Sequence, residues 1–470
     1  MFDDSDEEKS NSEPSELIQR IEEYFKIGGQ AYFNEEEYDE IINIYSENKS
    51  YQKALKVTEI ALKQYPFSVV FLLRQAQLYG ASNQISKAFE ALSKAEVFDP
   101  NNDEIWFTKG TLYSHLNEHD KAIYFYKQAL KISNEADEIL MMIAIEYENK
   151  KDFEKAIHYL KKAISKNIEN ELALYELAWC YEEAGLLPES IVYYNSLLDD
   201  YPYSVSAWYN LGMAHSKLKE FDKAIEAFDF CLAIEESFSS AYFNKANALA
   251  NQGEFAKAIE VYKETFEYEE PDAYTHYYLA ECYEKLEDYT QALIHYQKAV
   301  KIDPEFSIAW IGIGAIYDIK ESYIESLFHI KKGLDLDPNN AEYWYLYGDV
   351  LYNAGCPEEA IEAYKKTMLL DKSDIDVRID LAYVYHEFGY QQELDEIIQN
   401  LLNDYGLDNV DMVYIYAAYC FVTNQSKEGL IYLEAALDLD IEGVDRFLDF
   451  DPSFIHNPKI IDLISLYKEI

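Results

Sequence analysis

Residues 205–238 read VSAWYNLGMAHSKLKEFDKAIEAFDFCLAIEESF, a 34-residue stretch whose pattern recurs through almost the whole chain. Frames of this length follow one another without a gap from Glu35, and the eleventh begins at Ile375. A twelfth begins one residue late, at Val410. Position 20 of the frames is almost always small: Ala54, Ala88, Ala122, Ala156, Ser190, Ala224, Ala258, Ala292, Ser326, Ala360, Leu394 and Gly429. Because only a small side chain fits where two helices touch closely, this column predicts stacked helix pairs.

Each frame holds two apolar runs at helical spacing, separated by a polar turn. Position 15, in that turn, is glycine in four frames, and glycine can take the left-handed conformation that ends a helix. Proline at position 32 stops the second helix in several frames. A single helix pair cannot bury its own apolar face, so we expect neighbouring pairs to stack.

Further columns repeat with the same spacing. They are tryptophan at position 4 (Trp106, Trp208, Trp310, Trp344), glycine at position 8 (Gly110, Gly212, Gly314, Gly348) and proline at position 32 (Pro66, Pro100, Pro202, Pro304, Pro338). With tyrosine at position 11, the pattern resembles the tetratricopeptide repeat, W-x2-L-G-x2-Y, then A-x3-F, then P. The resemblance implies an all-α, right-handed α-solenoid (superhelix) of helix-turn-helix repeats. We also expect Trp208 and Trp310 to be buried.

The period divides the chain into four parts. Residues 1–16 are acidic and we expect them to be disordered. Residues 17–34 form a predicted N-terminal capping helix, residues 35–443 the twelve repeats, and residues 444–470 a C-terminal capping segment. An alternative for the last part is that its phenylalanine-rich stretch, 447–455, is itself a docking segment.

The net charge of −48, from 40 basic and 88 acidic residues, repels nucleic acid and anionic membranes, so we expect neither as a partner. The sequence shows no basic-then-apolar signal at its start and no apolar run long enough to span a membrane. We therefore expect a cytoplasmic protein. The five cysteines show no CxxC spacing, and we expect them to be reduced and mostly buried.

The sequence contains no motif typical of catalysis. His115 and His119 have the i, i+4 spacing of helical metal ligands, but no third ligand lies within sequence reach. Gly312 and Gly314 lack the third glycine and the preceding strand of a nucleotide loop. We expect no enzyme activity, no cofactor and no metal.

In the family that the chain resembles, positions 2, 5, 6, 9, 12 and 13 line the inner groove of the superhelix. Here these groove positions hold 19 acidic residues and three basic ones, with an aromatic and aliphatic row at position 5. The tyrosines of that row are open to a second interpretation, because they can simply pack against the next helix. The candidate partner-binding residues are Phe107, Tyr175, Trp179, Tyr209, Phe243, Tyr277, Tyr345, Glu148, Glu182, Glu183, Glu281 and Glu284.

Two functions are consistent with these observations. The first is a non-catalytic scaffold or adaptor whose acidic, aromatic-lined groove binds a protein or peptide segment that is basic and carries apolar anchors. The second is a regulatory subunit of a larger assembly that docks through its ends or its convex surface.

Overall fold

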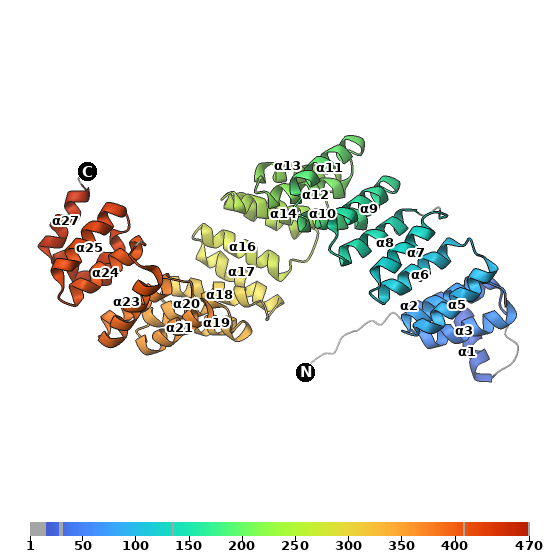
Figure 1. The fold of residues 1–470 in the computed structure, drawn as a ribbon, viewed down its shortest axis with the longest axis horizontal. Helices are drawn as coiled ribbons and strands as arrows, with labels where there is room; N and C mark the ends of the chain where they lie inside the picture. Colours follow the sequence, from blue (N-terminus) through green and yellow to red (C-terminus); the bar gives the residue numbers. More distant parts are fainter. Residues whose placement is uncertain (1–15, 28–31, 134–135, 408, 469–470) are drawn as a thin grey trace. The chain divides into compact units, whose positions relative to one another are not determined.

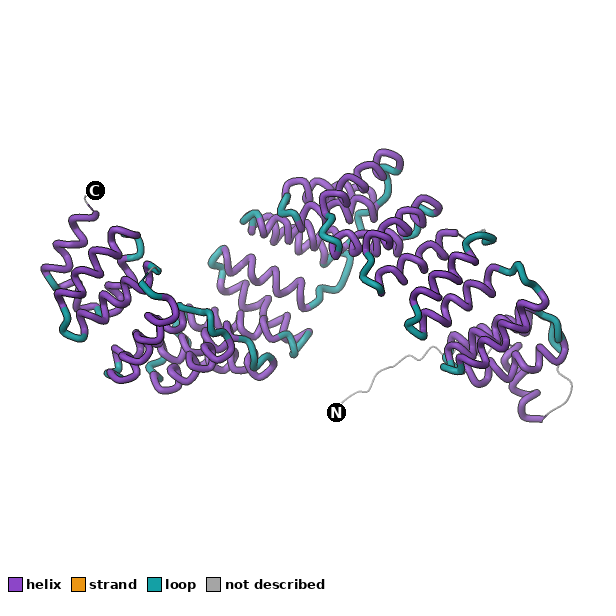
Figure 2. The backbone as a smooth tube through the Cα atoms, viewed as in Figure 1, coloured by secondary structure: helices purple, strands orange, loops and turns teal. Residues whose placement is uncertain are grey.

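The computed structural model describes residues 16–27, 32–133, 136–407 and 409–468, and all regular structure in them is helical. In the described residues, twenty-seven α-helices and one short 3-10 helix follow one another along the chain. Figures 1 and 2 show the helices. Two compact units divide the chain, Met1–Glu236 and Ser237–Ile470. Within each unit consecutive helices pack as antiparallel hairpins, which confirms an all-α helical-repeat solenoid. The predicted acidic tail up to residue 15 lies outside the described residues.

The first unit contains thirteen helices. They are α1 (Glu16–Ile27), α2 (Glu35–Glu47), α3 (Tyr51–Gln64), α4 (Val69–Ala81), α5 (Ile85–Phe98), α6 (Asp103–His115), α7 (His119–Ala129), α8 (Ala136–Asn149), α9 (Phe153–Lys166), α10 (Glu171–Glu183), α11 (Leu187–Asp200), α12 (Val205–Lys217) and α13 (Phe221–Ile234).

The second unit contains the remaining fourteen helices and the 3-10 turn. They are α14 (Ser239–Asn251), α15 (Phe255–Thr265), α16 (Ala273–Lys285), α17 (Tyr289–Ile302), α18 (Ser307–Ile319), α19 (Tyr323–Leu336), α20 (Ala341–Asn353), α21 (Pro357–Leu370), α22 (Asp376–Glu387), α23 (Gln391–Tyr405), α24 (Val410–Val422), α25 (Ser426–Leu439), α26 (Val444–Phe450), η1 (Pro452–His456) and α27 (Pro458–Lys468).

Helices α2–α25 form twelve pairs, and the first helix of a pair begins at the first residue of its frame in ten of them. The exceptions, α8 and α22, begin one residue early and one residue late. The alanines of the position-20 column are fully buried, as close helix packing requires. The glycines at position 8 serve the same contact, since a Cβ on Gly212 would lie 2.6 Å from the ring of Phe228.

Every one of the twelve turns contains a residue with positive φ at position 15. Glycine occupies this position in four repeats, for example Gly355 with φ 76°. Asparagine, lysine or glutamate occupies it in the others, for example Lys219 with φ 60° and Glu321 with φ 56°. The turn therefore keeps one backbone geometry whatever the residue, and its glycine column is a preference rather than a requirement.

The expectation that Trp208 and Trp310 are buried is wrong, because both side chains are only half-buried. Each indole lies at the edge of a repeat, where its Nε1 donates to a proline carbonyl of the preceding repeat. One ring face packs on the second helix, Trp208 on Phe230 at 4.5 Å between centroids and Trp310 on His329 at 5.6 Å. The polar end of the indole stays near the surface, as is usual for tryptophan.

Additional helices pack against the first and last repeats. At the N-terminal end, Ile21 of α1 is buried and the guanidinium of Arg20 lies 4.5 Å from the centre of the Phe33 ring. At the C-terminal end, α26 packs on α24 and α27 on α25. Phe447, Phe450 and Phe454 are buried there, so their rings attach the segment to the array and present no apolar surface to a partner.

Candidate functional site

The first helices of neighbouring repeats form a layer within each unit. In the first unit α2 contacts α4, α4 contacts α6 and α10 contacts α12, and in the second α14 contacts α16 and α18 contacts α20. The groove positions of adjacent repeats are therefore neighbours in space. Residues that are far apart in the sequence but share this layer can act on the same ligand.

Of the four aromatic candidates in the first unit, two are exposed and two are packed. Tyr175 is 65% exposed and Trp179, one helical turn along α10, is 40% exposed. The Trp179 ring meets Phe153 edge-on at 5.5 Å, which holds it in place. Phe107 and Tyr209 are half-buried against the second helix of their own repeat. Phe107 and Tyr209 of the position-5 row thus pack within their repeats, whereas Tyr175 of that row is exposed together with Trp179 at position 9.

The candidate carboxylates of the first unit differ in how far they are buried and in whether a lysine pairs with them. Glu148 is only 9% exposed, and its Oε1 accepts a hydrogen bond from Cys180 Sγ at 3.2 Å. Burial raises the pKa of Glu148 to about 7. Glu182 pairs with Lys217 at 2.6 Å, so a groove lysine offsets its charge. Glu148 is covered by the next first helix, whereas Glu183 is exposed.

In the second unit the predicted carboxylates are bonded to tyrosine hydroxyls. Tyr277 donates to Glu281 at 2.7 Å, and Tyr296 of α17 donates to Glu284 at 2.7 Å. Burial raises the pKa of Glu281, and the bond from Tyr277 offsets only part of this rise. Phe243 packs on Tyr278 at 5.7 Å between centroids, so the aromatic candidates of α14 and α16 form one continuous cluster.

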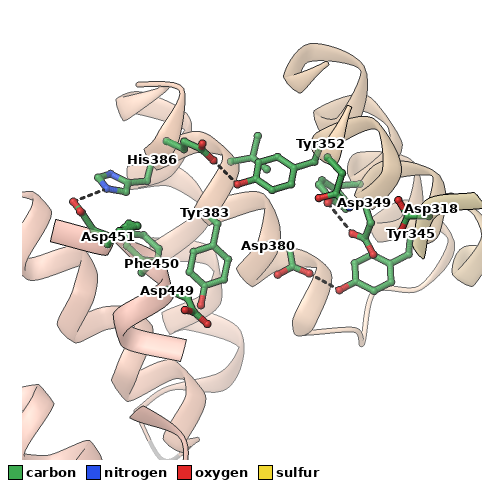
Figure 3. Close-up of a pocket in the computed structure, with 15 residues that line it drawn as sticks. Asp318, Tyr345, Asp349, Tyr352, Asp380, Tyr383, His386, Asp449, Phe450 and Asp451 are labelled. Atoms are coloured by element: carbon green, nitrogen blue, oxygen red, sulfur yellow. Dashed lines mark hydrogen bonds and ion pairs between the residues drawn. The ribbon is translucent and has the colours of Figure 1, made fainter. Parts of the chain in front are cut away.

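A cavity of about 790 Å³ lies at the C-terminal end of the second unit, and we call it the C-terminal pocket. Its walls come from α18, α20, α21, α22, α26 and the start of η1 (Figure 3). It is lined by Asp318, Tyr345, Asp349, Tyr352, Asn353, Tyr364, Asp380, Tyr383, Val384, His386, Glu387, Asp449, Phe450, Asp451 and Pro452. Six of these residues are carboxylates and none is lysine or arginine.

Tyrosine hydroxyls orient three of the pocket carboxylates. Tyr364 donates to Asp349 Oδ1 at 2.8 Å, Tyr345 donates to Asp380 and Tyr352 donates to Glu387 (Figure 3). Burial raises the pKa of Asp349 to about 7, and it also raises the pKa of Asp380. The pocket therefore holds more negative charge than its own side chains neutralise.

Two smaller cavities in the first unit share this composition. One, of about 460 Å³, is lined by Phe107 together with Asp103, Glu104 and Glu138. The other, of about 530 Å³, is lined by five carboxylates of α2, among them Asp39, which pairs with Arg74 at 2.8 Å. Neither lining includes a lysine or arginine. Acidic cavities thus occur in both units.

Only part of the lining of the C-terminal pocket could be predicted from the sequence. Tyr345 was a candidate, and Asp318, Asp349, Asp380 and Glu387 occupy groove positions of their frames. Asp449 and Asp451 follow the last frame, so the period contains no information about where they lie. They reach the pocket because α26 and η1 fold back onto α22, where Tyr383 donates to the Arg446 carbonyl at 2.7 Å and His386 Nε2 lies 3.1 Å from Asp451.

In the described part of the chain, no group of three or more histidine, cysteine, aspartate or glutamate residues has an arrangement suited to a metal ion. His119 instead lies 2.7 Å from the buried carboxylate of Glu146. None of the described helices combines the length and the apolar character needed to cross a membrane.

Models of a single protein family match the sequence. Models described as tetratricopeptide repeat match residues 103–135, 141–205, 205–238, 243–305 and 320–440, which together make up more than half of the chain. A comparison with curated proteins found no match.

Solved structures of helical-repeat proteins are similar to the chain at low identity. The crystal structure of YrrB, a TPR protein with an unusual peptide-binding site, is 18% identical, with a TM-score of 0.34, over 39% of this chain and 95% of that one. MamA from Desulfovibrio magneticus RS-1 is 20% identical, with a TM-score of 0.35, over 36% and 97%. The APC/C hetero-tetramer Cut9-Hcn1 is 14% identical, with a TM-score of 0.40, over 96% and 99%.

Proposed function

The chain belongs to the tetratricopeptide repeat family, and on that premise we propose that it is a non-catalytic scaffold or adaptor for a basic partner segment. The segment carries apolar anchors and binds the layer of first helices. We further propose that the protein acts in the cytoplasm, in keeping with five free thiols, four of them buried.

The observation that carries this proposal is the lining of the three cavities. All three are rich in carboxylates, and none is lined by a lysine or arginine. A cleft with charges of one sign focuses the electric field and raises the local concentration of oppositely charged ligands. A basic segment is attracted at every such cavity, whereas an acidic segment or a nucleic acid is repelled.

Exposed aromatic side chains supply the apolar part of the surface. In the first unit these are Tyr175 and Trp179, with the exposed carboxylate of Glu183 on the same helix. In the second unit, Tyr277 and Tyr345 lie beside carboxylates that they orient. A cation over such a ring contributes roughly 0.5–2 kcal/mol, so lysine or arginine residues of a partner gain from both features.

An immobilised peptide array tests the proposal. The array carries three versions of one leucine-rich peptide, in which the polar positions are lysine and arginine, serine, or glutamate. The array is incubated with the full-length protein. We expect retention of the basic version only, with weaker binding as salt rises. Tyr175→Ala with Trp179→Ala should weaken binding about tenfold, as loss of a central aromatic anchor does. The control is Tyr124→Ala on the second helix α7, a tyrosine of similar exposure.

Equal retention of the three versions, or no retention of any, would refute a basic-segment scaffold. The second function, a regulatory subunit that docks through its convex or terminal surfaces, would then be favoured. Exposed apolar side chains on second helices, such as Val192 on α11 and Ile324 with Phe328 on α19, are the observation that supports it. Mutation of these residues would be the next experiment.

A further inference from the structure

The C-terminal pocket differs from the rest of the first-helix layer because it has an end wall. Helix α18 contacts α20, hydrogen bonds from Tyr345 and Tyr352 join α20 to α22, and α26 with η1 closes the space next to α22. In Figure 3, Asp318, Asp349 and Tyr345 lie on one side and His386, Phe450 and Asp451 on the other, with Tyr383 and Asp380 between them. All the walls belong to the second unit. The pocket is therefore a site of one unit, deep enough for a side chain.

The carboxylates of this pocket retain hydrogen-bond acceptors. Asp349 and Asp380 each receive one tyrosine hydroxyl, and no residue in the described part of the chain donates to their second oxygen. Asp318 Oδ1 is buried without a donor in hydrogen-bonding geometry among the described residues, and Asn353 is the polar neighbour that interacts with this carboxylate. A buried acceptor without a donor is unfavourable, so Asp318 Oδ1 favours a ligand that brings N–H groups, and the second oxygens of Asp349 and Asp380 can accept further hydrogen bonds from the same ligand.

No lysine or arginine lines the pocket, and Arg446, outside the lining, offsets only part of the rise in the pKa of Asp380. The four arginines of the chain are all in ion pairs elsewhere, Arg20 with Glu37, Arg74 with Asp39, Arg378 with Asp404, and Arg446 with Asp376 and Asp411. A second copy of the protein therefore has no unpaired arginine to offer. With a net charge of −48 a second copy is also repelled overall, so we expect the charge complement to come from a different protein.

Resting on the proposed scaffold function, we propose that the C-terminal pocket binds an arginine side chain of the partner segment. A guanidinium offers five N–H donors in a planar fork that matches carboxylates, stacks on aromatic rings and is weakly hydrated. The pocket supplies carboxylates together with the half-buried ring of Tyr383, which packs on the buried Phe450 at 5.1 Å between centroids. A lysine ammonium is compact and strongly hydrated, so it gains less from this combination.

The electrostatics of Asp349 support the same ligand. Its neighbours are Asp318 of α18, Tyr345 of α20, Tyr364 of α21 and Asp380 of α22, and no cation is among them. Burial and these carboxylates raise the pKa of Asp349 to about 7. An arginine stays charged at every pH of interest, so its affinity should rise between about pH 5.5 and about pH 8 as Asp349 loses its proton.

The test is a fluorescein-labelled peptide with leucine anchors and one central position that is arginine, lysine or citrulline, titrated into the full chain by anisotropy. Citrulline keeps the shape of arginine without its charge. We expect affinity in the order arginine, lysine, citrulline, with a loss of about tenfold or more from arginine to citrulline. Asp349→Asn with Asp380→Asn should remove this preference, because each asparagine can still accept the tyrosine hydrogen bond but carries no charge.

A charge-matched control is available on α19, where Glu325→Gln with Asp335→Asn changes two exposed carboxylates outside the pocket. This control should retain the preference. As a second pocket variant, Asp449→Lys places a cation at the exposed rim and should also weaken the arginine peptide. Circular dichroism checks that each variant is folded.

Two results separate this inference from the proposed function. If the arginine peptide binds but the citrulline peptide or the Asp349→Asn, Asp380→Asn variant binds equally well, the pocket inference is wrong and the scaffold function stands. If neither the arginine nor the lysine peptide binds the wild-type protein, both fail.

Discussion

At the scale of single residues, one type of hydrogen bond links three tryptophans to the repeat before. The indole Nε1 of Trp208 donates to the Pro202 carbonyl at 2.9 Å, and Trp344 donates to Pro338 at 2.9 Å. Trp310 makes the same bond to Pro304 at 3.0 Å. The tryptophan lies at position 4 of one repeat and the proline at position 32 of the repeat before. In these three places the tryptophan side chain joins consecutive repeats.

Trp208 allows this bond to be measured. Trp208→Phe keeps an aromatic ring on Phe230 and removes the N–H donor, so we expect a loss of about 1 kcal/mol in the free energy of unfolding. Trp208→Ala also removes the ring contact, and because the side chain is half-buried we expect about 2–3 kcal/mol, less than for a fully buried tryptophan. Urea denaturation followed by circular dichroism gives both values.

The control is Trp106→Phe, since the Trp106 Nε1 makes no hydrogen bond within the described residues and its ring is stacked on Phe125 at 6.0 Å. If Trp208→Phe costs no more than Trp106→Phe, the bond to Pro202 does not stabilise the array.

At the scale of the helix pair, α16 and α17 enclose two buried histidines. His276 Nδ1 and His295 Nδ1 lie 3.1 Å apart, and the imidazole of His295 stacks on Tyr283. Burial, together with the neighbouring His276, lowers the pKa of His295 to about 4, and burial also lowers the pKa of His276. The contact is compatible with neutral rings, one as donor and one as acceptor, so protonation of either ring opposes this packing.

This pair predicts a loss of stability in acid. A histidine whose pKa is depressed in the folded state binds fewer protons there than when unfolded, so stability falls as pH drops below about 6.5. Between pH 6.5 and about 5, the depressed pKa of His295 alone costs about 1.6 kcal/mol. We expect the melting temperature of His295→Phe to fall less on acidification than that of the wild type.

Differential scanning calorimetry at pH 6.5 and about pH 5 measures both melting temperatures. Carboxylates that titrate in the same range shift the melting temperature of both proteins alike, so their effect does not enter the comparison. The exposed His158→Phe is the control and should leave the acid shift unchanged. An acid shift as large in His295→Phe as in the wild type would show that His295 does not titrate as inferred.

At the scale of the whole molecule, the net charge of −48 acts on both folding and binding. Many carboxylates repel one another in the compact state, and the ion pairs of the described residues, such as Lys109 with Glu96 and Lys53 with Glu22, are local. Salt screens repulsion between exposed charges over distances longer than the Debye length. Folding and the attraction of a basic partner should therefore respond to salt in opposite directions.

Raising the salt concentration from about 0.01 M to about 0.15 M shortens the Debye length from about 30 Å to about 8 Å. We expect the melting temperature to rise by a few degrees, since about 1 kcal/mol corresponds to roughly 2–4 °C for a unit of this size. Over the same range a basic peptide should bind more weakly. A neutral osmolyte at equal osmolarity is the control, and a melting temperature that falls with salt would contradict the expectation.

The surroundings of a surface side chain could be predicted from the sequence only where its neighbours lie close to it along the chain. Tyr175 and Trp179 could be placed together because one helical turn separates them in α10. The burial of Glu148 could not be predicted, because it depends on Cys180 in the next first helix. The pairing of Glu182 with Lys217 has the same origin, in contact between α10 and α12. Position in a frame thus indicates which face a side chain occupies, but not which neighbour meets it.

By itself the sequence determined the helix pairs, their boundaries, the close contacts at position 20 and the acidic character of the groove positions. These follow from local periodicity, which repeats within every 34 residues. The tertiary structure alone decided that α26 and η1 fold back on α22 and so close the C-terminal pocket. That closure joins Tyr383 to Arg446 and His386 to Asp451, residues more than sixty positions apart and on opposite sides of the period's end. A repeat pattern cannot encode a contact that occurs once.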